Sequence, residues 1–266
     1  MYLKVTALRG TLLIIAALLA TSFAAFGEHR MISLGDRRLS LDCDGKAGSA
    51  TVVLIAGGVR TAKDWAKVQP AVSNFARVCS YDRAGLGESD KAASKLQPAD
   101  EVVDDLHGLL QASGERSPFI LVGHSIGGIY VRSFVAKFPH DVAGLVFVDS
   151  AHEEQALRLH ELAPKVEGLG EQTAQFGFFV NSGERLEWRT ELPLIVLRHG
   201  KPFPRTQELT EEQFAAWDRI WREFQEDLAR RSTHGEVRVA EQSDHYIQLD
   251  QPELVIQAIR DVLQDR

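Results

Sequence analysis

The sequence predicts an α/β domain built on a mostly parallel β-sheet flanked by helices. Short, continuously apolar segments rich in valine, isoleucine and leucine recur along the chain, and amphipathic helical stretches separate them. Strands that alternate with helices are joined by crossover connections, which run the strands parallel. The 266 residues suffice for one such domain with a large core, so a second domain is not required.

The predicted elements follow one another in a regular order. Segment 30–42 alternates apolar and polar residues around Gly35 and Asp36, which predicts a β-hairpin. Later apolar runs, typical of strands buried on both faces, predict strands at 51–56, 77–81, 119–122, 143–148, 194–197 and 236–240. Helical periodicity predicts helices at 65–75, 98–113, 126–138 and 254–263.

Two insertions interrupt this order. Residues 150–193 are too many for a simple crossover, so we expect a helical cap or lid over the strand ends. An aromatic cluster at 176–180 within it fits either an acyl pocket or the insertion's own core. The second insertion, 209–231, is a charged helix, and packing is favoured over ligand binding for the side chains that recur at helical spacing: Phe214, Trp217, Ile220, Trp221, Phe224 and Leu228.

The N-terminus differs from the rest of the chain. Lys4 and Arg9 precede an uncharged stretch, 10–27, with an apolar centre and small residues at its end, the order typical of a secretory signal. An uncleaved anchor is the alternative, because the stretch approaches the roughly 20 residues that span a bilayer. We therefore separate residues 1–27 from the domain, 28–266, and expect an exported protein, periplasmic or extracellular, that meets a membrane only through an uncleaved anchor.

Charge and cysteine content narrow the partners and the compartment. The net charge of −7 leaves no basic surplus to neutralise phosphates, so nucleic acid is not an expected partner. The two cysteines, Cys43 and Cys79, can form a disulfide in an exported protein. Two buried free thiols fit the sequence about equally well.

The segment 119–128, FILVGHSIGG, carries the main chemical signal. It contains G-x-S-x-G at 123–127, directly after a predicted strand and before a predicted helix, which is the context this motif requires. A serine on such a strained turn exposes its hydroxyl, and the N–H groups of the helix face developing negative charge. The motif predicts Ser125 as a nucleophile, and the alternative is a serine that only caps an ordinary helix.

GHSIGG, together with YDRAGLGESD at 81–90 and SDHYIQLDQPE at 243–253, resembles the α/β-hydrolase family over most of the chain after residue 30. The resemblance implies an eight-stranded, mostly parallel sheet and a triad in the order serine, acid, histidine. It also implies that no metal or organic cofactor takes part. Because this strand order makes the strand of Cys79 a neighbour of the strand ending near Cys43, the resemblance favours a disulfide between them.

The base that a serine nucleophile needs is expected at His245. This residue follows the last predicted strand, and its position and following sequence resemble the family's histidine loop. The family often has glycine at the preceding position, where this chain has Asp244.

The acid is harder to assign. The family usually places it after the strand at 194–197, where this chain has no carboxylate before Glu208. The other location used in this fold is the end of the preceding strand, which predicts Asp149, with Glu153 in reserve. A carboxylate there could accept the Nδ1 proton of the histidine and hold its productive tautomer. A solvated or helix-capping aspartate is the alternative.

Two backbone donors are expected to form an oxyanion hole. One is the N–H of Ile126, which follows the nucleophile. The other lies in the turn after 51–56, where the family commonly has His-Gly and this chain has Ala56 followed by two glycines. Since the backbone does this work, the donor survives the change, and we predict Gly58, with Gly57 next.

These residues predict a serine hydrolase that cleaves a small carboxylic ester, less often an amide, through an acyl-enzyme on Ser125. Hydroxynitrile lyase, perhydrolase and acyltransferase chemistry on the same fold are alternatives. A non-catalytic small-molecule receptor is the alternative from another class. Dehalogenases and epoxide hydrolases are disfavoured, because their nucleophile is a carboxylate where this chain has Ser125.

Overall fold

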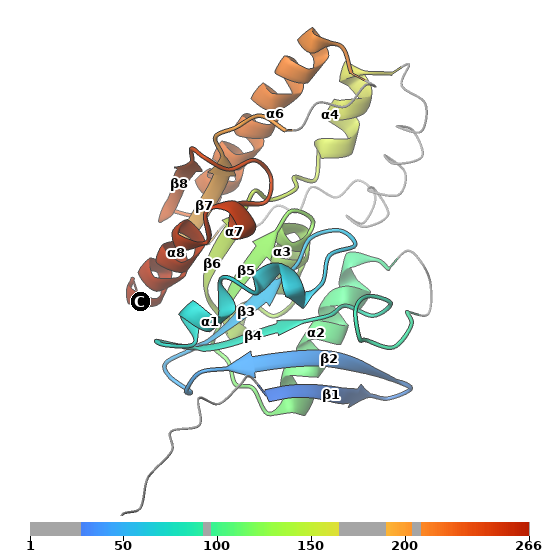
Figure 1. Cartoon of the computed structure of the whole chain (residues 1–266), viewed down its shortest axis with the longest axis vertical. Coiled ribbons are helices and arrows are strands. Elements are labelled where there is room, and N and C mark those ends of the chain that lie inside the picture. The colour runs from blue at the N-terminus through green and yellow to red at the C-terminus, as the bar shows by residue number, and fades with distance from the viewer. Residues whose placement is uncertain (1–27, 93–96, 165–189, 204–208, 266) are drawn as a thin grey trace, which may run out of the picture.

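A computed structural model describes residues 28–92, 97–164, 190–203 and 209–265 (Figure 1). Its centre is an eight-stranded sheet in the order β1-β2-β4-β3-β5-β6-β7-β8. The pairs β1–β2 and β2–β4 are antiparallel and all other pairs are parallel. The strands are β1 (Glu28–Leu34), β2 (Arg37–Asp44), β3 (Thr51–Ile55), β4 (Arg77–Tyr81), β5 (Phe119–His124), β6 (Val142–Val148), β7 (Leu194–His199) and β8 (Gly235–Ala240). The predicted mostly parallel sheet is confirmed.

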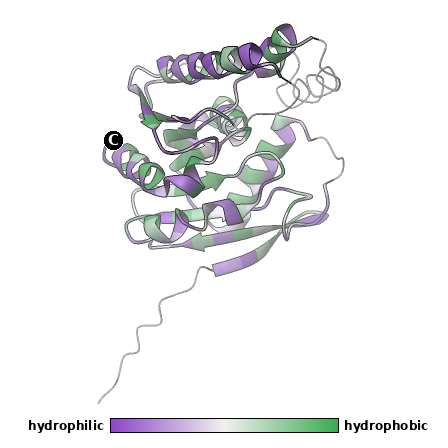
Figure 2. Ribbon diagram, turned by 45° about the horizontal axis from the view of Figure 1, so that its top comes forward, coloured by the Kyte–Doolittle hydropathy of each residue, from purple (hydrophilic) through white to green (hydrophobic). Residues whose placement is uncertain are grey.

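The central strands are buried on both faces, as their apolar runs predict. In β3, Val53 and Ile55 pack into the core on one side of the sheet, and Val52 and Leu54 pack into the core on the other. Figure 2 shows the same contrast, because the central strands are mainly green whereas the long helix α6 alternates between purple and green. A strand that alternates its side chains between two covered faces needs apolar residues at every position.

Helices cover the two faces of the sheet as separate layers (Figure 1). On one face lie α2 (Ala99–Ser113), α3 (Gly127–Lys137) and the end of α6 (Glu211–Arg230). On the other lie η1 (Ala62–Trp65), α1 (Gln69–Val72), α7 (Ile247–Asp250) and α8 (Pro252–Gln264). A short 3-10 turn, η2 (Pro139–Asp141), leads into β6.

The helix predicted at 65–75 is wrong as a single element. The structure has η1 up to Trp65, then turns, then only four residues of α1 beginning at Gln69. Pro70 occupies the first turn of α1. Since proline has no backbone N–H and its ring clashes with the preceding turn, it is accommodated at the start of a helix and interrupts a longer one.

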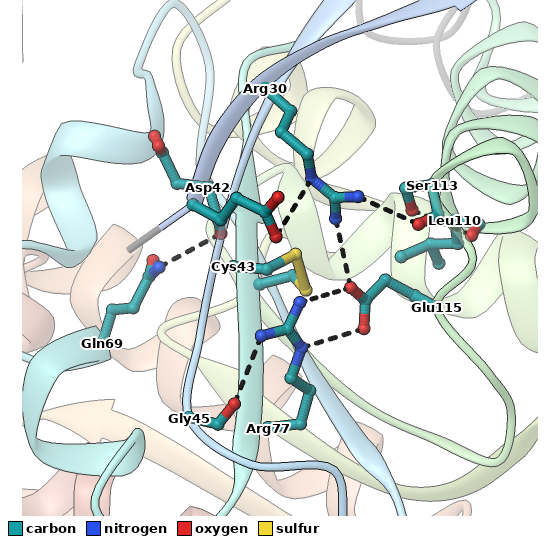
Figure 3. Close-up of a disulfide and its surroundings, with 11 residues drawn as sticks. Arg30, Asp42, Cys43, Gly45, Gln69, Arg77, Leu110, Ser113 and Glu115 are labelled. Carbon is teal, nitrogen blue, oxygen red and sulfur yellow. Dashed lines mark hydrogen bonds and ion pairs between the residues drawn. A yellow bond between two sulfur atoms is a disulfide. The ribbon is translucent and has the colours of Figure 1, made fainter. Parts of the chain in front are cut away.

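The antiparallel edge of the sheet is cross-linked. β1 and β2 form the predicted hairpin, and Cys43 of β2 lies directly opposite Cys79 of β4. A disulfide joins the two residues, which resolves the alternatives that the sequence leaves open (Figure 3). Beside it, Arg30 and Arg77 both bind the carboxylate of Glu115.

The two insertions meet above the carboxyl ends of the strands. α4 (Gln155–Leu162) begins the first and packs against α6, which forms most of the second. Trp217, Trp221 and Phe224 form a small core with Leu159 and Leu162, so the aromatic side chains of α6 serve packing as expected. The cluster at 176–180 lies outside the described residues.

The N-terminal segment 1–27 also lies outside the described residues. Within the described ranges, the structure holds no helix that is both long and apolar enough to span a bilayer.

Candidate active site

Ser125 sits on a sharp turn between a strand and a helix. β5 ends at His124 and α3 begins at Gly127, and Ser125 between them has a φ of 53°. The left-handed region is sterically costly for a residue with a Cβ, so a serine that stays there is held by its surroundings. Its N–H donates to Val148 O at 3.1 Å, and the residue is partly exposed.

The glycines of the motif are needed because backbone closes around this turn. A Cβ on Gly123 would lie 2.7 Å from the carbonyl carbon of Gly127, and one on Gly127 would lie 2.5 Å from Ile55 O. No side chain fits at either distance. The G-x-S-x-G spacing therefore reports the crowding that raises Ser125 above the sheet.

The structure brings Asp149 and His245 together. Asp149 follows β6, is fully buried, and its Oδ2 lies 2.7 Å from His245 Nδ1. Its Oδ1 accepts hydrogen bonds from Trp221 Nε1 and from the backbone N–H of His199, both at 3.0 Å. The carboxylate is therefore fixed from several directions, and His245 is left with Nε2 as the nitrogen able to accept a proton.

The environment keeps Asp149 ionised. Burial alone would raise the pKa of its carboxyl. Hydrogen bonds from His199 and His245, with the positive charges these rings can carry, outweigh burial and hold the pKa of Asp149 well below its usual range. A carboxylate that is ionised at neutral pH can orient the imidazole of His245 and stabilise its protonated form.

His124 ties the serine turn to the loop of His245. Its Nε2 donates to His245 O at 2.9 Å, and the two rings lie 4.7 Å apart between centroids. Burial, followed by the charge of His245, lowers the pKa of His124 to about 3, so its ring stays neutral. The structure records no hydrogen bond between the Ser125 hydroxyl and His245 among its described residues. Such catalytic contacts are often long before substrate binds.

The reserve acid is engaged elsewhere. Glu153 lies 3.4 Å from Arg132 Nη2 and 2.5 Å from Arg231 Nη2, and no contact joins it to His245 among the described residues. Asp244 accepts the N–H of Tyr246 at 3.2 Å within its own loop. Asp149 is therefore the carboxylate that contacts the imidazole.

Of the two predicted oxyanion donors, Ile126 follows the serine directly, and Gly58 belongs to a turn that lies against it through Gly57. A Cβ on Gly57 would lie 3.0 Å from Ser125 Cβ, which places the turn after β3 directly against the nucleophile. Within the described chain, the N–H groups of Gly58 and Ile126 have no acceptor. Free N–H groups next to the serine are what an oxyanion hole requires.

A buried arginine holds this turn in place. The guanidinium of Arg83 donates to three successive carbonyls, those of Ala56 at 2.5 Å, Gly57 at 2.8 Å and Gly58. Arg83 is only 6% exposed and belongs to the loop DRAGLGESD. Since each carbonyl bound by Arg83 fixes the peptide plane that follows it, the loop that resembles the family's structural loop orients the turn of Gly58.

Comparison with known proteins adds the family. Residues 52–258 match the sequence model described as the alpha/beta hydrolase family. The chain belongs to the α/β-hydrolase family. The hydrolase is 28% identical over 229 residues to the uncharacterized protein YqjL of Bacillus subtilis, covering 81% of this chain and 84% of that one.

Two further similarities are to proteins whose names state an activity. Lipase 1 of Psychrobacter immobilis is 41% identical over 70 residues, which are 26% of the hydrolase and 22% of the lipase. The structure of a thermophilic esterase from Thermogutta terrifontis covers 90% of the hydrolase and 98% of its own chain, with a TM-score of 0.58 and 19% identity. At that identity, the structural likeness shows the fold alone.

The contact between His199 and Asp149 is not predicted from the sequence. His199 ends β7, where the family usually has its acid, and its ring binds Asp149 instead of replacing it. Strands β6 and β7 pair Val148 with Leu197, so the residues that follow them lie at one edge of the sheet. This adjacency can be inferred from the predicted order of the strands. In contrast, nothing in the sequence indicates the contacts that Asp218 and Trp221 of α6 make.

A metal site is not evident in the described part of the hydrolase. The one group of metal-ligating side chains found there is Cys43, Cys79 and Glu115. Both sulfurs belong to the disulfide and cannot act as thiolate ligands.

Proposed function

We propose that this protein is a serine hydrolase that cleaves carboxylic esters of small molecules through an acyl-enzyme on Ser125. The observation that carries the proposal is the shared location of three groups at the carboxyl ends of the parallel strands. Ser125 is raised on a strained turn, His245 is linked to that turn through His124, and Asp149 binds the far nitrogen of the His245 ring. This is the arrangement that activates a serine hydroxyl.

In the first half of the reaction, His245 Nε2 accepts the hydroxyl proton while Ser125 Oγ bonds to the carbonyl carbon of the ester. The carbonyl oxygen becomes an oxyanion and receives the N–H groups of Gly58 and Ile126. His245 then returns the proton to the leaving alkoxide as the carbon–oxygen bond breaks. The alcohol departs and the acyl group stays on Ser125.

In the second half, water takes the place of the alcohol. His245 Nε2 accepts a proton from water as its oxygen bonds to the acyl carbon, and the same proton passes to Ser125 Oγ when the acyl bond breaks. A carboxylic acid leaves and the free serine is restored. Asp149 keeps its negative charge throughout and stabilises the imidazolium formed in each half.

An ester substrate is supported by the local sequence resemblance to a lipase and by the fold shared with an esterase. Export to the periplasm or the cell exterior is part of the proposal. It is supported by the signal-like order of residues 1–27 and by the disulfide, because disulfides persist in oxidising compartments.

Labelling with a fluorophosphonate, followed by peptide mapping, tests the nucleophile. We expect one adduct, on Ser125, in the wild type and none in Ser125→Ala. A folded wild type without an adduct would contradict the proposal and favour the receptor alternative.

A substrate panel tests the ester preference. p-Nitrophenyl acetate, butyrate and octanoate are compared with the p-nitroanilides of the same acyl groups. We expect the esters to be hydrolysed faster than their matched anilides. A protein that labels at Ser125 but leaves every ester intact would favour lyase, perhydrolase or acyltransferase chemistry instead.

A further inference from the structure

A second imidazole shares the carboxylate that orients His245. His199 is 1% exposed, and its Nδ1 lies 2.9 Å from Asp149 Oδ2 and 3.0 Å from Asp149 Oδ1. Its other nitrogen, Nε2, lies 3.1 Å from Asp218 Oδ1 on helix α6. The reaction proposed above gives this buried, titratable ring no role.

The number of N–H donors that the contacts of the His199 ring require determines its protonation state. An ionised carboxylate only accepts hydrogen bonds, and a neutral imidazole has a single N–H to donate. Asp149 is ionised, and the carboxyl group of Asp218 also accepts a hydrogen bond from the guanidinium of Arg222. Both contacts of His199 are therefore satisfied only when both of its nitrogens carry a proton.

We propose that His199 is a positioning residue held as an imidazolium between Asp149 and Asp218, and that its positive charge limits how strongly His245 retains a proton. This inference rests on the proposed function, since it assigns a purpose to the charge around the proposed base. Because Asp149 binds both rings, its negative charge stabilises a proton on His245 less than it would if it bound that ring alone.

The charges around His199 agree with this assignment. Burial disfavours the protonated ring, but the hydrogen bonds and charges of Asp149 and Asp218 outweigh burial and raise the pKa of His199. The other charged or titratable groups that contact these two carboxylates are His245, which faces Asp149, and Arg222, which reaches Asp218.

The remaining neighbours of His199 are one further charged residue and two aromatic rings. Arg198, the preceding residue of β7, binds the His199 carbonyl at 3.0 Å and leaves its ring untouched. Phe203 and Trp221 contact the ring as aromatic neighbours. The proton on His199 therefore depends on two carboxylates, one on a strand end and one on the cap helix.

The test measures how fast a fluorophosphonate inactivates Ser125 as a function of pH. The acid limb of this profile reports protonation of His245 in the free protein. His199→Asn keeps a donor for Asp149 but removes the charge, and Asp218→Asn removes the carboxylate that holds the second proton. We expect the acid limb to move up by about one pH unit in both variants, the shift typical when a nearby charge changes.

Glu223→Gln is the matched control. Glu223 lies exposed on the same helix, so its change removes one negative charge without touching His199. We expect its acid limb to coincide with that of the wild type. If the acid limb stays in place in His199→Asn and Asp218→Asn while the rate falls, His199 is only a structural spacer and the inference is overturned.

Histidine NMR of the wild type supplies a readout that needs no catalysis. We expect both ring nitrogens of His199 to remain protonated at pH 7, where an ordinary histidine with a pKa of about 6.5 is mostly neutral. A neutral His199 ring would overturn the inference. If Ser125 fails to label, the proposed function fails, and the NMR titrations of His199 and His245 in the wild type and His199→Asn still decide this point separately.

Discussion

The antiparallel edge of the sheet and the carboxyl ends of its parallel strands hold their charged groups in different ways. At the edge, the Cys43–Cys79 disulfide joins two directly paired strands, and Glu115 binds two arginines beside it. No non-glycine residue of β1, β2 or β4 has a positive φ. The edge region is built for stability.

The carboxyl ends carry strain and buried charge instead. Ser125 and Asp149 are the two non-glycine residues with positive φ in the described ranges, and both directly follow a strand. Such residues cost about 1–3 kcal/mol each. This fold therefore accepts unfavourable local geometry at the strand ends where chemistry is proposed, and it is cross-linked at its antiparallel edge.

Asp149→Asn, at the carboxyl ends of the strands, is expected to have the largest effect on activity. The amide keeps the shape but loses the charge that selects the His245 tautomer, so turnover should fall by about 10⁴-fold. Steady-state kinetics with the best ester of the panel measures the loss. Activity close to that of the wild type would remove Asp149 from the proposed triad.

Removing the disulfide should act on stability instead. In Cys43→Ser/Cys79→Ser, the loss of a cross-link between residues 36 apart should lower the free energy of unfolding by about 4 kcal/mol. Denaturant unfolding measures this, and the rate of Ser125 labelling should remain that of the wild type in folded protein. A double variant that folds but no longer labels would show that the two regions are not independent.

Arg83→Met tests whether the loop arginine positions the oxyanion turn. Without its guanidinium, three carbonyls lose their donor and Gly58 loses its fixed orientation. We expect kcat to fall by about 10²-fold, comparable to the loss of one oxyanion donor, with little change in KM. Arg83→Lys keeps the charge but cannot bind three carbonyls together, so it should lie between Arg83→Met and the wild type. A rise in KM alone would point to substrate binding instead.

The smallest expected effect concerns strain at Ser125 itself. Both Ser125→Ala and Ser125→Gly lack the hydroxyl, but only glycine adopts a φ of 53° without steric cost. We expect the glycine variant to be more stable than the alanine variant by about 1 kcal/mol, as measured by thermal or denaturant unfolding. Equal stabilities would mean that this turn stores no strain.

Much of the fold follows from local pattern. The apolar runs predict the strands because those strands are covered on both faces, and G-x-S-x-G predicts the turn at Ser125 because its crowding requires glycine at fixed spacing. The interrupted helix at 65–75 shows the limit of periodicity, since one proline divides an otherwise helical pattern.

The site is less predictable where it depends on distant segments. Asp149 follows from the missing carboxylate after β7, and the structure places it against His245, while its role stays a proposal. The partners Asp218 and Trp221 come from a helix whose placement over the sheet has no signature in its residue pattern. Likewise, the disulfide depends on the register between β2 and β4, which cysteine counting cannot supply.

Trapping the acyl-enzyme is the most direct test of Ser125 as the nucleophile. The protein is mixed with p-nitrophenyl butyrate, quenched in acid during the first turnover, and examined by intact mass and peptide mapping. We predict a mass increase equal to one butyryl group, located on Ser125 and absent from Ser125→Ala. Turnover of the ester with no acyl group on Ser125, or with the group on another residue, would contradict this role.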